Sequence, residues 1–239
     1  MIFSNRVVRL FLNNFFLCIK ALFCSVYFNF RVLPFRQAIH LPFLCFVWPS
    51  IEGKGEVRLD CPVKMFMLRL GFHKMPVFPQ HTLIWSNKGT IVFKGICDIG
   101  HHLMIRVYKD GYLEFGNQVA LNSGCRVACQ HRIVFKQKVR VSWECQFYDT
   151  NFHPIMDLVA NRPVKMTSPI IIGEDVWIGH NVIISKGVKL ADGIIVSSGS
   201  VVKNSFKLPN CIISGNPAVK ISEGYRAEFD NFRLVNDFS

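Results

Sequence analysis

The chain has 239 residues, 50% of them hydrophobic, so it can bury the core of one sizeable domain and still carry an appendage. Its net charge of +12 at pH 7 indicates an acidic partner, such as an anionic membrane surface, a phosphate-bearing cofactor, an acidic polymer or nucleic acid. Lysine and arginine are spread along the chain without a helix-turn-helix, zinc-finger or RNA-recognition signature, and this argues against nucleic acid.

Residues 1–31 are rich in phenylalanine, leucine, valine and cysteine, but basic residues divide them into runs of at most ten uncharged residues. A transmembrane helix needs about twenty. In a helix, which turns about 100° per residue, a polar stripe lies opposite a broad apolar side. The stripe consists of Arg6, Arg9, Asn13, Lys20 and Arg31. We therefore expect a helix lying in a membrane interface, or the same apolar side packed on the protein or a neighbouring subunit. A cleaved signal peptide is less favoured, because basic residues recur through the apolar region.

Three prolines, Pro34, Pro42 and Pro49, interrupt the next apolar stretch, which cannot continue as one helix. We expect a hinge there and a short segment that leads into the main domain. Residues 51–113 have the composition of strands with irregular spacing. A step of six residues first shows at Phe93, Ile99 and Ile105.

A strict step of six organises the second half of the chain. Apolar residues follow it at Phe115, Leu121, Val127, Ile133, Val139 and Cys145, and again at Ile172, Ile178, Ile184, Leu190, Val196 and Val202. A helix repeats about every 3.6 residues and a strand every two, so this step belongs to a short supersecondary unit. Glycines in the second series suit tight corners. The pattern predicts a β-solenoid in which three hexads form one triangular coil, with the aliphatic residues pointing to its axis.

These residues resemble the hexapeptide-repeat acyltransferases of polysaccharide biosynthesis, whose fold is a left-handed parallel β-helix. The hand comes from the resemblance, because general crossover rules favour a right-handed connection. The similarity covers about residues 113–221, and the Trp-Ile-Gly at 177–179 and the Gly-Asn-Pro-Ala at 215–218 resemble late-coil signatures of the family. It implies a mainly β protein with an N-terminal apolar helical segment over 1–50, a β-helix over 51–221 and a tail over 222–239.

The hexads stop across residues 146–171, a polar segment with three prolines, and a long excursion from a regular scaffold is more often functional than accidental. Its part Tyr148–Pro154 resembles the place where this family keeps its catalytic histidine. The resemblance implies that His153 removes the proton of an acceptor hydroxyl as the hydroxyl attacks a thioester, by direct transfer without an acyl-enzyme.

A carboxylate often holds the imidazole of such a base in one tautomer. We expect Asp149 in this role, with Asp157 and Glu144 as alternatives. The simpler interpretation of His153 is a loop histidine hydrogen-bonded to one of the two aspartates.

The resemblance also implies acetyl-CoA as the acyl donor, lying in the groove between adjacent subunits of a homotrimer. Trp177 matches a tryptophan that lines this groove, and the backbone at His180 and Ser198 matches positions that meet the pantetheine arm. Lys203 stands where basic or hydroxyl residues contact the cofactor phosphates. Without the resemblance, Trp177 is an aromatic cover on one coil face and Lys203 a solvated cation.

Metal and disulfide chemistry find little support in the sequence. None of the eight histidines has the spacing of a zinc ligand set, so we expect no metal site. The nine cysteines include no Cys-x-x-Cys pair, and several lie in apolar runs. We expect reduced, buried thiols in a cytoplasmic protein.

The resemblance thus implies a trimeric O-acetyltransferase for a sugar or lipid-linked saccharide in capsule, O-antigen or exopolysaccharide biosynthesis, and we expect it to be cytoplasmic. A peripheral contact of residues 1–31 with the inner membrane would bring the protein to a lipid-linked acceptor, and this expectation comes from the resemblance. The alternatives are a different small acceptor, such as serine or an antibiotic, and a non-catalytic β-helix scaffold.

Overall fold

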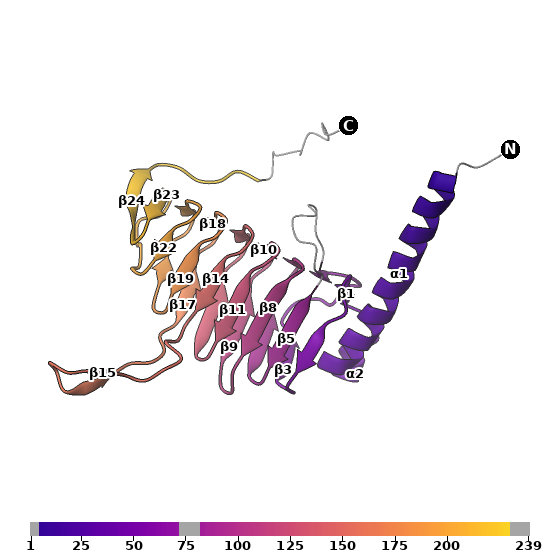
Figure 1. Cartoon of the computed structure of the whole chain (residues 1–239), viewed down its shortest axis with the longest axis horizontal. Coiled ribbons are helices and arrows are strands. Elements are labelled where there is room, and N and C mark those ends of the chain that lie inside the picture. The colour runs from indigo at the N-terminus through magenta and orange to yellow at the C-terminus, as the bar shows by residue number, and fades with distance from the viewer. Residues whose placement is uncertain (1–4, 72–81, 230–239) are drawn as a thin grey trace.

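The computed structural model describes residues 5–71 and 82–229, and its strands wind into a solenoid with a long helix at the N-terminal end (Figure 1). Sheet A contains, in spatial order, β1 (Phe43–Cys45), β4 (Leu68–Leu70), β7 (Cys97–Ile99), β10 (Val119–Leu121), β13 (Arg140–Val141), β18 (Trp177–Ile178), β21 (Ile195–Val196), β23 (Cys211–Gly215) and β24 (Ala218–Glu223). Sheet B contains β2 (Ser50–Glu52), β5 (Leu83–Asn87), β8 (Leu103–Val107), β11 (Arg126–Cys129), β14 (Gln146–Tyr148), β19 (Ile183–Ser185) and β22 (Val201–Val202). Sheet C contains β3 (Glu56–Leu59), β6 (Thr90–Phe93), β9 (Tyr112–Phe115), β12 (Arg132–Phe135), β17 (Ile170–Ile172) and β20 (Lys189–Leu190).

Each coil passes through sheets A, B and C in turn, and each strand pairs in parallel with the equivalent strand of the previous coil. The coils therefore have three corners, which we name A–B, B–C and C–A after the sheets they join. The predicted fold class is confirmed: the chain is mainly β and forms a parallel β-helix with an N-terminal helix. The first coil begins at Phe43, ahead of the expected boundary at residue 51.

The core contains two inward series of side chains rather than one. The predicted series from Ile172 to Val202 points to the axis, and all its members are buried. A second buried series, which the hexad argument missed, consists of Ile170, Val176, Val182, Val188, Ile194 and Ser200. Each member of the second series lies two residues before a member of the first, in β17 or just ahead of a strand, and residues i and i+2 of an extended segment point to the same face.

The step of six between Phe115 and Cys145 changes from one series to the other at Ile133. Phe115 shares a register position with Phe135, whereas Ile133 pairs with Ile170 of the other series. The B–C corner is longer in this coil than after the excursion, and this moves the register while keeping Ile133 and Cys145 buried.

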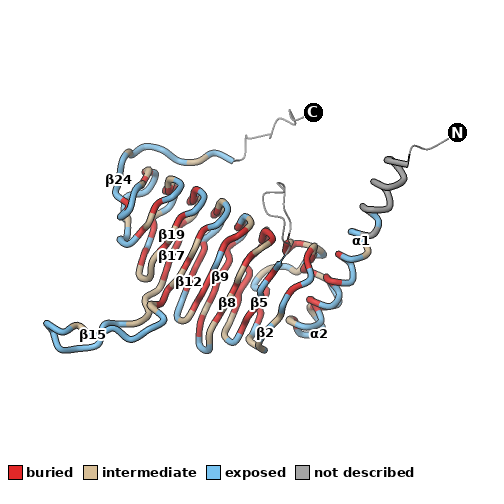
Figure 2. The backbone as a smooth tube through the Cα atoms, viewed as in Figure 1, coloured by how far each residue is buried: buried red, intermediate tan, exposed pale blue. Residues whose placement is uncertain are grey.

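Aromatic rings fill the wide N-terminal half of the axis. Phe93, Phe115 and Phe135 stack through successive coils, with ring centroids 5.1 and 5.5 Å apart. The buried positions form a continuous line through the coils, whereas the arm that bears β15 is exposed (Figure 2). Stacking equivalent residues explains part of the high phenylalanine content.

The helix α1 (Asn5–Val32) covers the open end of the solenoid, followed by the short α2 (Phe35–Ala38). Asn29 exchanges two hydrogen bonds with the backbone of Phe43, and the Ser25 hydroxyl accepts one from Cys45 N–H. These buried side chains satisfy the free edge of β1, which would otherwise expose unpaired backbone groups.

One side of α1 therefore packs on the protein, as one of the two expectations for this segment had it. The side chains of Arg6, Arg9 and Asn13 lie outside the described part of the chain. Among the described residues, no helix combines the length and hydropathy that a bilayer crossing requires.

All nine cysteines are free. The thiols of Cys24, Cys45, Cys97, Cys125, Cys129, Cys145 and Cys211 are buried, as expected. Cys18 is exposed and Cys61 is half-buried.

The excursion forms an arm that projects from the B–C corner, between β14 and β17 (Figure 1). Its outer part is a two-stranded antiparallel hairpin of β15 (Ile155–Asp157) and β16 (Arg162–Val164). At the C-terminal end of the solenoid, β24 turns back antiparallel to β23.

Candidate active site

Asp149 fixes the point where the arm leaves the solenoid. Its buried carboxylate accepts hydrogen bonds from three backbone N–H groups of the preceding coil: Gln130 to Oδ1 at 2.8 Å, and His131 and Arg132 to Oδ2 at 2.8 and 2.7 Å. A buried charge is tolerated only with such partners. Asp149 therefore closes the corner between β11 and β12.

The neck of the arm is held by Thr150 and Phe152. Thr150 pairs with Thr167 in an antiparallel bridge, and its hydroxyl donates to Gln130 Oε1 at 2.6 Å and accepts from Phe152 N–H at 3.0 Å. Phe152 has a φ of 63°, which is unusual for a bulky residue. Its ring rests against Tyr148, with centroids 5.6 Å apart, and this contact holds the turn. His153 is thus the first residue beyond a tightly held neck.

His153 itself is exposed, and no carboxylate contacts it in the described part of the chain. The predicted partner Asp149 is occupied by backbone N–H groups. Asp157 Oδ1 instead accepts the N–H groups of Val159 and Ala160 at the hairpin turn, at 3.0 and 2.9 Å. Glu144 lies at the A–B corner, away from the arm. Within one chain, none of the three predicted carboxylates meets the imidazole.

Three predicted donor-binding residues come together at the A–B corner of the coils that contain β18 and β21. Trp177 lies on the outer face of sheet A, and its indole N–H donates to Ser142 Oγ at 3.4 Å. The backbone N–H of His180 donates to Ser198 Oγ at 3.2 Å. The Ser198 hydroxyl, rather than the His180 N–H, is therefore available to a ligand there. The family motif groups Trp177, His180 and Ser198, and in the structure they lie on neighbouring coils.

The sequence analysis did not identify the side chains of Ser142 and Trp143, which also lie at this corner. The Trp143 ring stacks on His180, with centroids 5.0 Å apart and planes 13° from parallel, and Ser142 holds the Trp177 indole. Arg140 pairs with Trp177 in register, so Trp143 stands one coil below His180. The excursion separates Trp143 from His180 in the sequence, so the step of six does not reveal that they are neighbours.

Lys203 lies at a different corner from Trp177. It follows β22 of sheet B and is exposed at the B–C corner, from which the arm with His153 also leaves. The predicted site residues therefore divide into two groups: His153 and Lys203 at the B–C corner, and Trp177, His180 and Ser198 at or beside the A–B corner.

The Cys129 thiol beside the base of the arm is not activated as a nucleophile. Burial, and then the charge of Asp149, raise the pKa of the Cys129 thiol, so this thiol stays protonated at neutral pH. Across residues 5–71 and 82–229, no three His, Cys, Asp or Glu side chains gather as a metal ion would require.

The family model of the bacterial transferase hexapeptide (six repeats) matches residues 169–204. Among solved structures, the chain is similar to the polySia-specific acetyltransferase NeuO, with 21% identity and a TM-score of 0.50 over 82% of this chain and 94% of that chain. It is also similar to the polysialic acid O-acetyltransferase OatWY, with 22% identity and a TM-score of 0.37 over 79% and 97% of the two chains. A maltose O-acetyltransferase from Clostridium difficile 630 matches with 16% identity and a TM-score of 0.36 over 87% and 88%. No curated protein matches the chain.

The matched segment begins at the end of the arm and contains Trp177, His180, Ser198 and Lys203. The likeness to NeuO establishes the fold over most of the chain. The chain therefore has a parallel β-helix fold, and residues 169–204 match the bacterial transferase hexapeptide repeats.

Proposed function

We propose that the protein is an acetyl-CoA-dependent O-acetyltransferase that modifies a sugar hydroxyl during capsule, O-antigen or exopolysaccharide biosynthesis. The observation that carries the proposal is the position of His153, exposed beyond a held neck that leads directly into the transferase repeats. The fold shared with NeuO, a polySia-specific acetyltransferase, supports a related activity.

In this proposal His153 is the general base. A sugar hydroxyl is a weak nucleophile at neutral pH, and the imidazole removes its proton as the oxygen attacks the carbonyl carbon of the acetyl thioester. The carbon–sulfur bond then breaks, the acetyl group remains on the sugar oxygen, and the CoA thiolate takes the proton from the imidazolium. Asp149 serves as a positioning residue, because it fixes the base of the arm rather than the imidazole.

Two features support a homotrimer with sites between adjacent subunits. The arm carries exposed apolar side chains at Ile155, Met156, Leu158, Val159 and Val164, and such a surface marks a protein contact. The two groups of site residues lie at different corners of one chain, and a cyclic assembly sets one corner of each chain against another corner of its neighbour. His153 and Lys203 would then come from one subunit and Trp177 from the next.

The donor residues fit this arrangement. Trp177 offers an exposed indole face to the pantetheine arm, and the Ser198 hydroxyl offers a polar contact beside it. Lys203, as an exposed cation on the subunit that supplies His153, would meet the phosphates of the same acetyl-CoA.

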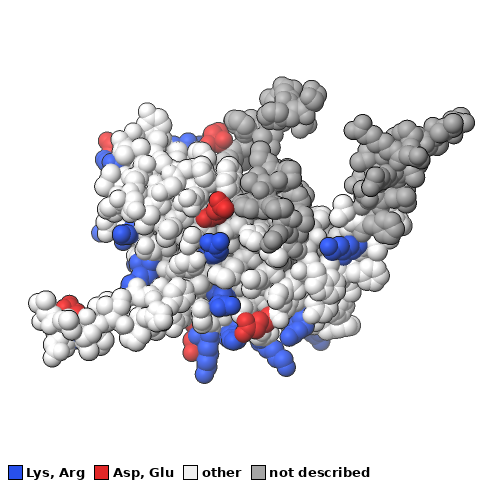
Figure 3. Space-filling model, viewed as in Figure 1, with Lys and Arg blue, Asp and Glu red and all other residues white. Residues whose placement is uncertain are grey.

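The B–C corner supports an anionic acceptor. A lysine recurs at this corner along the solenoid, at Lys54, Lys88, Lys109, Lys186 and Lys203. Basic side chains gather along the lower edge of the coils in Figure 3, the edge from which the arm leaves in Figure 1. Strands of neighbouring coils lie about 4.8 Å apart, so Lys54, Lys88 and Lys109 form one short row and Lys186 and Lys203 another, with the arm between them. Such cations suit a saccharide bearing carboxylates or phosphates.

The free side of α1 supports a peripheral contact with the inner face of a membrane. Phe23, Tyr27 and Phe30 are 67%, 42% and 47% exposed, and the Trp48 ring stacks on Tyr27 with centroids 5.0 Å apart. Lys20 and Arg31 lie beside this aromatic surface on the helix. Aromatic rings next to basic side chains suit the headgroup region of an anionic bilayer.

Serine substitution at Phe23, Tyr27 and Phe30 is therefore expected to reduce binding to anionic phospholipid vesicles by roughly tenfold or more. These side chains lie on the exposed side of α1, so the cap should stay folded. Vesicle co-sedimentation measures the bound fraction, and the exposed Val219 and Ile221 at the other end of the solenoid provide a matched serine control. Equal binding of native and triple-serine proteins would contradict the membrane contact.

Turnover of acetyl-CoA tests the proposed activity. The native protein is incubated with acetyl-CoA and a panel of neutral sugars, acidic oligosaccharides, nucleotide sugars and lipid-linked saccharides, and thiol release and the acetylated product are followed. We expect turnover with a saccharide, best with an anionic one and weaker at high salt. Absence of turnover across the panel would contradict the proposal.

A further inference from the structure

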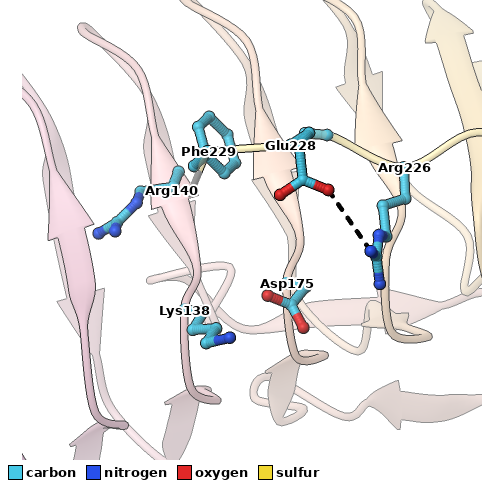
Figure 4. A pocket seen from close by; sticks show the side chains of 7 residues that line it. Lys138, Arg140, Asp175, Arg226, Glu228 and Phe229 are labelled. Carbon is cyan, nitrogen blue, oxygen red and sulfur yellow. Dashed lines mark hydrogen bonds and ion pairs between the residues drawn. The ribbon is translucent and has the colours of Figure 1, made fainter. Parts of the chain in front are cut away.

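The chain after β24 turns back over the outer face of sheet A, beside Trp177. The N–H groups of Gly224 and Tyr225 both donate to Asn210 O, at 2.8 and 2.9 Å, and this pair anchors the turn. We name residues 225–229 the C-terminal strap. The strap borders a small cavity of about 70 Å³, which is also lined by Lys138, Arg140 and Asp175. Figure 4 shows Arg226, Glu228 and Phe229 of the strap beside these residues.

The end of the strap lies against Trp177. The Phe229 ring meets the Trp177 ring edge to face, with centroids 6.2 Å apart and planes at 88°. The Arg140 guanidinium stands 5.8 Å from the Phe229 ring, and Arg140 is the register partner of Trp177 one coil below. Trp177 is therefore held between Ser142 on one side and the strap on the other.

The contacts of the strap beyond its anchor, within residues 5–71 and 82–229, are weak. They include the ring edge at Trp177, the cation–π contact at Arg140, and an exposed ion pair of 3.5 Å between Arg226 and Glu228, which joins the strap only to itself. Phe229 keeps 37% of its surface exposed, so little apolar area is buried there. Contacts of these kinds are individually weak and easily exchanged for a ligand.

We propose that the C-terminal strap is a gate on the donor site: Phe229 covers Trp177 in the free protein and leaves when the pantetheine arm of acetyl-CoA binds there. This inference rests on the proposed function, in which Trp177 contacts the donor. The pantetheine arm needs the part of the Trp177 ring that Phe229 covers, so the apparent affinity of the free protein equals the affinity of the open state multiplied by the fraction of time the gate is open. Phe229 thereby sets donor affinity without taking part in acetyl transfer.

The test is the Kd of acetyl-CoA for the full chain and for Phe229→Ala, measured by titration calorimetry. Removing the ring should lower Kd by about three- to tenfold, because the edge-to-face contact no longer competes with the donor. Tyr225→Ala is the matched control: Tyr225 is an exposed aromatic residue of the same strap and has no ring contact among the described residues. An unchanged or raised Kd in Phe229→Ala would overturn the gate.

A second measurement separates the gate from the proposed function. Acrylamide quenching of the Trp177 fluorescence, taken as the difference between each protein and its Trp177→Phe counterpart, should rise in Phe229→Ala and stay unchanged in Tyr225→Ala. If neither the native protein nor the variants bind acetyl-CoA, the proposed function fails, and a quenching increase would still show that the strap covers Trp177. Unchanged quenching in Phe229→Ala would overturn the cover itself.

Discussion

Replacement of Asp149 by alanine is expected to lower the free energy of unfolding by about 3 kcal/mol, because it leaves three backbone N–H groups without their shared acceptor. The carboxylate is fully buried and bonded to Gln130, His131 and Arg132 at 2.7–2.8 Å. Urea denaturation of the purified variant measures the loss. The base of the arm should also loosen, which would reduce acetyl transfer beyond the loss in folded protein.

Asp157→Ala is the matched control for this prediction. Asp157 also accepts two backbone N–H groups, from Val159 and Ala160, but at an exposed hairpin turn. Water replaces such an acceptor readily, so the control should lose about 1 kcal/mol or less. Asp149→Asn should fall between the two, because an amide offers only one acceptor oxygen. A loss in Asp149→Ala no larger than in Asp157→Ala would contradict the role assigned to this carboxylate.

Mixing two inactive variants is expected to restore activity if the site is shared between subunits. His153→Ala lacks the base at the B–C corner, and Trp177→Ala lacks the donor face on sheet A. In trimers assembled at random from equal amounts, about one quarter of the interfaces combine an intact His153 with an intact Trp177. The refolded mixture should therefore regain roughly a quarter of the native turnover, at least tenfold above either variant alone.

Each variant refolded alone is the control, and light scattering confirms that the mixture forms trimers. The double variant His153→Ala with Trp177→Ala, mixed with native protein, gives the activity expected from native interfaces only. Mixed trimers without recovered turnover would place both residues in the site of one chain, against the shared arrangement.

The periodic part of the fold could be predicted from the sequence because each coil repeats the same short-range requirement. A buried apolar residue every six positions and a corner that tolerates a positive φ are visible without any long-range information. The companion series at Ile170 and Val176 was missed because a step of six follows one position per hexad, whereas each hexad buries two residues that stand two apart. The closing of the first coil by Asn29 and Ser25 was also missed, because polar residues within an apolar helix give no signal of the strand edge they satisfy.

The candidate site was harder to predict because it depends on which corner each residue reaches. Trp177, His180 and Ser198, which the motif names as donor contacts, lie on neighbouring coils at or beside one corner. Proximity in sequence suggested Asp149 as a partner for His153. Side chains four residues apart in an irregular segment can point in different directions, and the Asp149 carboxylate instead accepts backbone N–H groups of the previous coil. The contact of Phe229 with Trp177 joins residues far apart in the chain and depends on the turn that Asn210 anchors, for which the sequence gives no signal.

The central claim is that the protein transfers an acetyl group with His153 as the base, and the turnover of acetyl-CoA by native protein and His153→Ala tests it most directly. His153 is exposed beyond the neck, so the variant should fold as the native protein does, and the Kd for acetyl-CoA should be unchanged. Turnover with the best saccharide should fall by about 100-fold or more. Equal turnover in the two proteins, with a saccharide that the native protein acetylates, would contradict the role of His153.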